Sequence, residues 1–401
     1  MKKMAVFFGG RTVEHEVSVV TGIQFIENAR GYETIPVYIT REGEWYTGEK
    51  LLDTMFIKNF NPNDKSISRV YMQPAEGKGR LCIVKRGLIG TTTETVDIDV
   101  AVPAMHGMNG EDGSIQGLFE LMNIPYTSSA MLGCSMSMDK IAMKQNFEAG
   151  GFPTLPYIWM MRSKWEKDRE ACIEKAETLG YPVFVKPANL GSSIGVSKAI
   201  DRKALTDAID LAAHYDRRIL IEKGLEDAIE INCSALGYED DVRSSLCEQP
   251  ISAKELLSFS DKYLGGSGAK GKISSGGKSG MASLSRLLPA PISKELTERI
   301  QAMTAEIFKS FDSKGVVRID YLTKKDESVL YVNEINMIPG SFAFYLWDKE
   351  PINMPYSKLI DKLVEYAEKA NKDKNANNYG FDSGKLLENM AKSPKHGGAK
   401  K

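Results

Sequence analysis

The sequence predicts an α/β protein built from more than one domain. Strand-like apolar runs alternate with helix-like patterns along most of the chain, and this alternation is typical of α/β architecture. The length of 401 residues exceeds what one ordinary core organises and predicts about two to three domains. A hydrophobic content of 42% and a charged content of 26% are those of a soluble globular protein.

Composition also excludes several classes of function. The net charge of −1 gives no electrostatic basis for binding nucleic acid or an anionic membrane. The apolar run in "MKKMAVFFGG" is too short for a signal peptide, and no segment approaches the ~20 apolar residues of a membrane span. The cysteines are odd in number, scattered and without a Cys-x-x-Cys pair: Cys82, Cys134, Cys172, Cys233 and Cys247. We expect free thiols in a reducing cytoplasm.

The predicted elements of a first domain run to about residue 128. They are a strand at "MAVFF", a helix over "EHEVSVVTGIQFIENAR" that ends at Gly31, a strand at "TIPVYIT", an apolar run in "DIDVAVPAMHG" that leads into a loop, and a short amphipathic helix over "SIQGLFELMNI". Pro125 stops that last helix. We therefore assign residues 1–128 to an N-terminal domain.

Two further domains are predicted after it. A helix over "SMDKIAMKQNFEAGG" has Ser137 as its expected N-cap and Gly150 as its stop. "YPVFVKPA" and "GVSKAI" then form a hairpin, which gives a small central domain over residues 129–217. The strand "RILIEKGL" is expected to open a larger C-terminal domain over residues 218–370.

Two segments stand apart in composition. Residues 264–282, "LGGSGAKGKISSGGKSGMA", are rich in Gly, Ser and Lys and fit either a flexible linker or a lid. The polar tail over residues 371–401 has few large apolar side chains, so we expect it to be mostly disordered.

The stretch "GVVRIDYLTKKDESVLYVNEIN", residues 315–336, predicts a hairpin with four polar side chains on one face. A turn centred near Glu327 pairs Leu322 with Val332, Asp320 with Glu334 and Arg318 with Asn336. Opposed carboxylates repel, and a divalent cation relieves the repulsion. Asp, Glu and Asn supply the oxygen ligands that Mg²⁺ prefers, and protein-bound Mg²⁺ usually also holds phosphates. The alternative is a solvated strand face with one ion pair to Arg318.

The hairpin loop in "VKPANLGSSIGVSK", residues 185–198, fits a phosphate cradle. Its glycines let backbone N–H groups approach an anion, and Lys186 adds a point charge. It is not a P-loop, which ends in Gly-Lys-Ser/Thr, and an ordinary Gly-Ser turn is the alternative. Upstream, Lys140 and Lys144 share one helix face, and Lys144 is expected to be solvated.

Two strand-to-helix junctions carry further candidates, because ligands bind at strand ends in α/β sheets. "HGMNGEDGSIQG", residues 106–117, contains His106, two adjacent carboxylates and four glycines. A lone loop histidine is usually structural, but the glycine content favours a site. "FGGRTVEHEVS" places Glu14 near a helix start, with Ser18 one turn later. A glutamate there is usually a partner of the helix dipole.

Taken together, these stretches resemble the D-alanine–D-alanine ligase family of the ATP-grasp fold. The motifs occur in family order over nearly the whole chain to about residue 350: "GG…EHEVS", "HGMNGEDGSIQG", "SMDK", "FVKPANLGSSIGVSK", "IEKG…EI", "DKY" and "VRIDYL…NEINMIPGS". The resemblance implies three α/β domains with ATP gripped between the second and third. It also implies ATP- and Mg²⁺-dependent joining of two D-alanines through an acyl phosphate, for peptidoglycan precursors, in a cytoplasmic homodimer.

The resemblance also implies residue roles. ATP would be bound by Lys140, Lys186, Ser193, Glu222, Lys223, Leu225, Glu230 and Lys262, with Glu222 beside the adenine and Glu230 at the ribose. Asp320, Glu334 and Asn336 would hold two Mg²⁺ ions, with Mn²⁺ as a possible substitute. The substrates would contact Glu14, His106, Tyr263, Arg318, Gly340 and Tyr345, and the catalytic set would be Glu14, Ser192, Tyr263, Arg318 and Gly340.

The chain departs from the family pattern in two places. Tyr345 stands where the motif commonly has a serine that contacts the second substrate, so D-alanine, D-serine and D-lactate all stay open as second substrates. The stretch after Lys262 and Tyr263 is longer and richer in Gly and Lys than expected, and its position favours a flap, residues 259–282, over a linker. A nucleotide-binding sensor without catalysis is the alternative of another class; the intact Arg318 and metal-ligand set argue against it.

Overall fold

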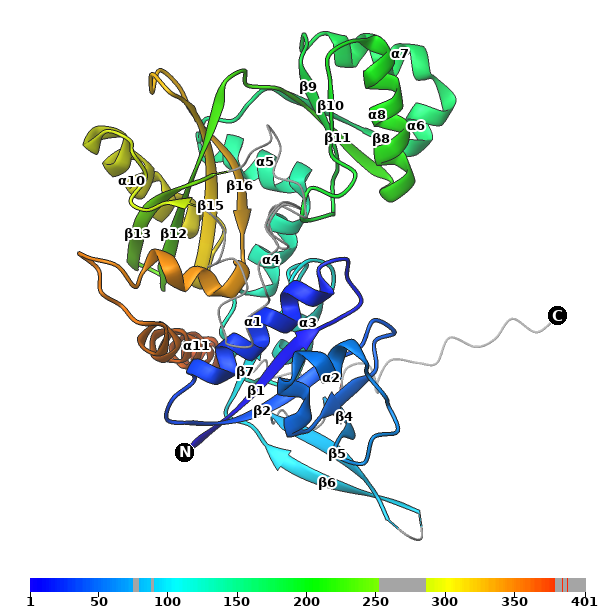
Figure 1. Ribbon diagram of the computed structural model, residues 1–401, viewed down its shortest axis with the longest axis vertical. Coiled ribbons are helices and arrows are strands. Elements are labelled where there is room, and N and C mark those ends of the chain that lie inside the picture. Colours follow the sequence, from blue (N-terminus) through cyan, green and yellow to red (C-terminus); the bar gives the residue numbers. More distant parts are fainter. Residues whose placement is uncertain (75–78, 88–89, 252–285, 379–383, 385–387, 389–401) are drawn as a thin grey trace, which may run out of the picture.

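The computed structural model describes residues 1–74, 79–87, 90–251 and 286–378, together with Gly384 and Glu388. These residues form three sheets, each with its own helices (Figure 1). The segment 264–282 and the predicted site residues Lys262 and Tyr263 lie outside the described residues, as does most of the region beyond residue 378. The α/β fold class is confirmed.

The first sheet has seven strands in the order β6-β5-β4-β3-β2-β1-β7, with β1 parallel to β2 and β7. Its strands are β1 Lys2–Gly9, β2 Tyr32–Ile39, β3 Trp45–Thr47, β4 Ser68–Met72, β5 Arg80–Arg86, β6 Thr91–Asp97 and β7 Val100–Pro103. Its helical segments are α1 His15–Asn28, η1 Glu49–Leu52, α2 Thr54–Lys58 and α3 Ser114–Leu121. From Met4 to Phe8 strand β1 is fully buried, as an unbroken apolar run in a parallel sheet requires.

The second sheet has four strands in the order β10-β9-β11-β8. The strands are β8 Tyr157–Met161, β9 Val183–Pro187, β10 Ser197–Ala199 and β11 Arg218–Lys223, and the helices are α6 Arg162–Lys167, α7 Arg169–Glu177 and α8 Arg202–Tyr215. The predicted hairpin between β9 and β10 is present and antiparallel. The strand Arg218–Lys223 does not open the third unit as predicted, because it pairs with β8 and β9.

The third sheet has five strands in the order β14-β13-β12-β15-β16. The strands are β12 Ala228–Tyr238, β13 Asp241–Pro250, β14 Arg286–Leu287, β15 Lys314–Lys324 and β16 Leu330–Asn336, with helices α10 Lys294–Ser310, η3 Gly340–Leu346 and α11 Tyr356–Ala376. Helix α11 includes residues 371–376, which the sequence assigned to a disordered tail; Lys374 pairs there with Glu120.

Two helices connect the three sheets. Helices α4 Met131–Met138 and α5 Lys140–Ala149 contribute Cys134, Met143 and Phe147 to the core beneath the five-stranded sheet. Figure 1 shows them at the centre of the molecule, with α5 nearer the green four-stranded unit and α4 nearer the first domain. On the other side, α11 and η3 share one core with β1 and α1 of the first sheet. The N- and C-terminal units are therefore joined by continuous apolar packing.

The cap of α5 differs from the prediction. Asp139, not Ser137, is the N-cap, and its side chain accepts from the backbone N–H groups of Ile141 and Ala142. Ser137 lies in the last turn of α4 and donates to the Cys134 carbonyl. Gly150 ends the helix as predicted. Among the described residues, none of the helices has the length and apolar content that crossing a membrane requires.

Candidate active site

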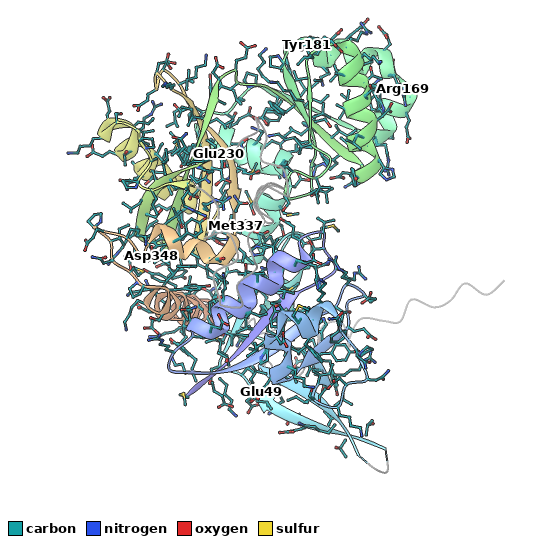
Figure 2. All side chains as sticks on the ribbon, viewed as in Figure 1. Glu49, Arg169, Tyr181, Glu230, Met337 and Asp348 are labelled. Carbon is teal, nitrogen blue, oxygen red and sulfur yellow. The ribbon has the colours of Figure 1, made fainter. Side chains whose placement is uncertain are left out.

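A cavity of about 590 Å³ lies between the four-stranded and five-stranded sheets. Figure 2 labels two residues of its wall, Glu230 and Met337, on the side of the five-stranded sheet. The volume lies in the range that small-molecule and cofactor sites occupy. The predicted site residues that line the cavity are Glu14, Lys140, Lys186, Ser192, Ser193, Glu222, Lys223, Leu225, Glu230, Arg318, Glu334 and Asn336. His106, Asp320, Gly340 and Tyr345 are not among its lining residues.

The Gly-Ser loop after β9 reaches across to the first domain. Ser192 and Ser193 both adopt left-handed backbone conformations, with φ of 51° and 58°. The Ser192 hydroxyl donates to the Glu14 carboxylate. A Cβ added to Gly191 would lie 2.5 Å from Glu14 Oε2, so a larger residue there would displace the Glu14 carboxylate. The loop is therefore more than an ordinary turn, because it closes the cavity against Glu14.

Glu14 is itself held by a chain of polar contacts. It is the residue before α1, and its carbonyl accepts from the Ser18 hydroxyl at 3.0 Å. Ser18 Oγ in turn accepts from the backbone N–H of His106 at 2.9 Å. The His106 ring contacts Thr21 Oγ1 at 2.8 Å, and burial lowers its pKa to about 4. A neutral His106 thus joins the two strand-to-helix junctions and supports Glu14 without lining the cavity.

Glu111 is a cavity residue that the sequence argument did not single out. Its carboxylate accepts from the backbone N–H groups of Gly107 at 2.8 Å and Ile338 at 3.0 Å. Burial, followed by the charge of Glu14, raises its pKa to about 8. The adjacent carboxylates in "HGMNGEDGSIQG" were the available signal. Spacing alone could not show which of the two faces the cavity.

Four charged side chains gather near β9 and β11, and three of them, Lys140, Lys186 and Glu222, line the cavity. Lys140 Nζ donates to the Leu190 carbonyl at 2.7 Å. Lys186 and Lys144 both pair with Glu222, at 2.7 and 2.6 Å. The prediction that Lys144 is solvated is wrong, because its side chain is 1% exposed. Helical spacing placed it on the face of Lys140 but could not show that β11 covers that face.

The charges of this group support one another. Burial lowers the pKa of Lys144, opposed by the attraction of Glu222. Burial alone would raise the pKa of Glu222, but the two lysines outweigh it and hold that pKa below its ordinary value. Burial likewise opposes the charge of Lys186, and Glu222 overcomes it, so the pKa of Lys186 is raised. Glu222 is therefore an anion shared by two cations.

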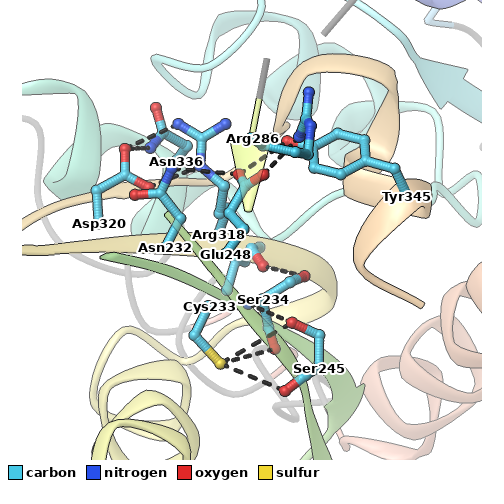
Figure 3. A network of polar contacts seen from close by, with 11 residues as sticks. Asn232, Cys233, Ser234, Ser245, Glu248, Arg286, Arg318, Asp320, Asn336 and Tyr345 are labelled. Carbon is cyan, nitrogen blue, oxygen red and sulfur yellow. Dashed lines mark hydrogen bonds and ion pairs between the residues drawn. The ribbon is translucent and has the colours of Figure 1, made fainter. Parts of the chain in front are cut away.

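The hairpin of β15 and β16 brings the predicted metal ligands together, and Figure 3 shows two of them, Asp320 and Asn336. Asp320 lies opposite Glu334, and Arg318 opposite Asn336, as predicted. Val332 pairs with Tyr321 instead of Leu322, because a register shift follows Asp320. Both Asp320 oxygens accept from the Arg318 guanidinium, at 2.6 and 2.8 Å, and Asn336 Nδ2 donates to Oδ2 at 3.1 Å.

Tyr345 belongs to a buried polar group beside this hairpin. The Arg286 guanidinium stacks 3.8 Å from the centre of the Tyr345 ring and pairs with Glu248. The Tyr345 hydroxyl donates to Glu248 at 3.4 Å, and Asn232 donates to the same oxygen (Figure 3). Burial raises the Tyr345 pKa to about 12. Gly340 is buried at the start of η3.

Comparison with known families shows which family the chain belongs to. Residues 3–129 match the family model for the D-ala D-ala ligase N-terminus, and residues 147–365 match the model for the D-ala D-ala ligase C-terminus. The chain belongs to the D-alanine–D-alanine ligase family. The resemblance inferred from the motifs is confirmed.

Individual members of the D-alanine–D-alanine ligase family match along most of their length. The ligase of Thermoanaerobacter sp. (strain X514) is 36% identical over 377 residues, 93% of this chain and 98% of that protein. The ligase of Heliobacterium modesticaldum is 38% identical over 372 residues, 90% of this chain and 93% of that protein.

Solved structures agree on the fold. The D-Ala:D-Ser ligase VanG of Enterococcus faecalis superposes with a TM-score of 0.73 at 28% identity, covering 91% of this chain and 99% of VanG. The D-alanine-D-alanine ligase of Coxiella burnetii gives a TM-score of 0.73 at 22% identity, covering 98% and 99%. This chain thus has the ATP-grasp fold and is an ATP-dependent ligase of a family that uses a divalent metal.

The residues fit these two groups. The cavity lining includes Lys140, Lys186, Lys198 and Lys223, whose charges suit a polyphosphate. Among the described residues no cluster of three His, Cys, Asp or Glu side chains is placed to hold a metal. The candidate is instead two carboxylates and one amide, a hard-oxygen set appropriate to Mg²⁺.

Proposed function

We propose that this ligase joins two D-alanines to D-alanyl-D-alanine at the cavity, for the synthesis of peptidoglycan precursors. The carboxylate of the first D-alanine attacks the γ-phosphate of ATP and gives an acyl phosphate and ADP. The amine of the second D-alanine then displaces phosphate. One observation carries the proposal: a single cavity brings Glu14 from the first domain, the lysines of the central sheet and Arg318 of the third sheet to common walls.

In this mechanism each wall of the cavity contacts a different part of the substrates. Glu14, held by Ser18 and Ser192, accepts from the ammonium of the first D-alanine. Lys140 and Lys186 bind the phosphates, while Glu222, Lys223, Leu225 and Glu230 line the base and ribose end. Arg318 offers its guanidinium to the reacting carboxyl and later to the tetrahedral oxyanion, together with the Gly340 backbone N–H. Fixed donors of this kind need no reorganisation when charge develops.

Asp320, Glu334 and Asn336 would hold the divalent metal. A bound Mg²⁺ supplies charge neutralisation on the phosphates and helps to align them for in-line transfer. We propose two ions, with Mn²⁺ able to substitute. Arg318 shares Asp320 with that site, so the same carboxylate orients the guanidinium and the metal ligands.

The second substrate is proposed to be D-alanine, with D-serine and D-lactate as the alternatives. The D-Ala:D-Ser ligase among the structural relatives keeps D-serine open. Tyr345 does not line the cavity, and we propose that it shapes the binding of the second substrate indirectly, through its contacts with Arg286 and Glu248. Lys262, Tyr263 and the flap 259–282 are proposed to complete the site for this substrate; they lie outside the described residues.

The test is to identify the product. The chain is incubated with ATP, Mg²⁺, D-alanine and equimolar D-serine or D-lactate, and the products are weighed by mass spectrometry. D-alanyl-D-alanine with one ADP per dipeptide is the expected result. A product that contains D-serine or D-lactate would show that this compound, and not D-alanine, is the second substrate. If the chain binds nucleotide but forms no ADP from ATP in the presence of D-alanine, it is a sensor and not a ligase.

We also propose a cytoplasmic homodimer. All five cysteines are free and buried, which suits a reducing compartment. Dimer formation is checked by light scattering during size-exclusion chromatography, where a single species with the monomer mass of 44.4 kDa would contradict it.

A further inference from the structure

We propose that Lys144 is a positioning residue for the nucleotide: as the buried counter-ion of Glu222, it leaves Lys186 available to bind ATP. This inference rests on the nucleotide binding proposed above. Lys144 is absent from the cavity lining, so it acts through Glu222 and not by contact with the nucleotide.

The contacts assign separate oxygens of Glu222 to the two lysines. Lys144 Nζ lies 2.6 Å from Oε1, and Lys186 Nζ lies 2.7 Å from Oε2. The side chains of Lys144 and Glu222 are 1% and 2% exposed, whereas that of Lys186 is 15% exposed and lines the cavity. Lys144 Nζ also lies 5.5 Å from the centre of the Tyr157 ring. Only one of the two cations, Lys186, therefore faces the cavity.

The charge balance explains why the second cation matters. With both lysines protonated and Glu222 ionised, the group carries a net charge of +1 toward a polyanionic nucleotide. Without Lys144 the group is neutral, and among the described residues Lys186 is the lysine that still pairs with Glu222. Lys186 would then be drawn to Glu222 and away from the nucleotide, because buried charges interact strongly over such distances.

If Lys144 only held α5 against β11, breaking another ion pair between these two elements should weaken ADP binding equally. The chain contains such a pair, which serves as a matched control. Lys144 lies on α5 and Glu222 on β11, and a second ion pair joins the same two elements: Asp139, the N-cap of α5, pairs with Arg218 of β11. Neither Asp139 nor Arg218 is among the residues that line the cavity. Breaking the second pair perturbs the α5–β11 contact without changing the charge around Glu222.

The experiment measures the Kd of Mg–ADP for the full-length chain by isothermal titration calorimetry. Wild type must bind, or the proposed function itself fails. Lys144→Met is expected to weaken ADP about tenfold, the loss expected when a charged hydrogen bond is misplaced. Lys144→Gln keeps a donor but removes the charge, and the same loss is expected. It also serves if Lys144→Met does not fold. Arg218→Met should bind ADP like wild type.

Measurements in the Glu222→Gln variant further distinguish a positioning role of Lys144 from a purely structural one. In Glu222→Gln the buried Lys144 amine loses its paired counter-ion and keeps only the weaker attraction of Glu148, so burial should favour its neutral form. Adding Lys144→Met to Glu222→Gln should then change the Kd by less than about twofold, since double-mutant cycles detect only residues that act together. Wild-type ADP affinity in folded Lys144→Gln, or a tenfold loss that persists in the Glu222→Gln background, overturns the inference.

Discussion

Single residues at this site act as shared partners. Asp320 accepts from both Arg318 and Asn336, Glu14 is reached by the Ser192 hydroxyl, and Glu222 is divided between two lysines. Removing one partner of such a buried charge leaves the other imperfectly compensated. Substitutions at these positions should therefore lower stability as well as alter chemistry and binding.

The variant Glu334→Gln tests the proposed metal site. The amide is a weaker metal ligand, so ADP release should fall on the order of a hundredfold and require more Mg²⁺. Loss of the charge opposite Asp320 removes a cross-strand repulsion, so the melting temperature should not fall. Glu298→Gln, on the exposed side of α10, is the control and should match wild type. Near-normal ADP release from folded Glu334→Gln would refute the metal site.

Glu111 predicts a pH dependence of stability. Its pKa of about 8 in the fold exceeds the ordinary 4.5, so the folded chain keeps a proton that the unfolded chain releases. The free energy of unfolding should therefore fall as pH rises from about 4.5 to about 8, by at most about 1.4 kcal/mol per pH unit. Urea titrations across this range should show a smaller fall for Glu111→Gln.

The neighbouring carboxylate provides the check on this assignment. Glu14 raises the pKa of Glu111 through its charge. In Glu14→Gln the fall in stability should therefore end at a lower pH than in wild type. An unchanged pH profile in both Glu111→Gln and Glu14→Gln would show that another group titrates.

At the scale of elements, strand periodicity and turn position are sufficient to predict the hairpin of β15 and β16. They put Asp320 opposite Glu334 and Arg318 opposite Asn336. The register shift after Asp320 was not predictable, because alternating polarity does not show where an extra residue enters a ladder. The burial of Lys144 was missed for a related reason: helix periodicity gives a face, whereas its covering by β11 is tertiary.

The cap of α5 yields a prediction for an element. Asp139→Ala removes a side chain that accepts from two backbone N–H groups, so it should lower the free energy of unfolding by about 1 kcal/mol or more. Asp139→Asn keeps the cap and removes the charge that pairs with Arg218. Asp139→Asn should therefore lower the free energy of unfolding less than Asp139→Ala does. The difference between the two variants, measured by urea denaturation, gives the contribution of the cap. Ser137→Ala should cost less than Asp139→Ala; the reverse order would restore Ser137 as the cap.

At the scale of the whole molecule, the three sheets are joined unequally. The first sheet shares a continuous apolar core with η3 and α11. The four-stranded sheet meets α5 through a small cluster of Ile141, Ala188 and Leu220, supplemented by the two ion pairs between α5 and β11. Sequence patterns identified the units but not this difference, since burial between units depends on which faces meet. The weaker junction is the one beside the cavity.

A ligand that contacts both walls of the cavity should strengthen that junction. Mg–ADP at a hundred times its Kd should raise the free energy of unfolding by about 2.7 kcal/mol, if it binds only the folded chain. Because the lining comes from β9 and β11 on one side and β15 and β16 on the other, hydrogen exchange should slow in those strands. The β4–β6 strands of the first sheet, whose residues are absent from the lining, should exchange at an unchanged rate. Slowing confined to the four-stranded sheet would mean that ADP binds one wall and does not bridge the two sheets.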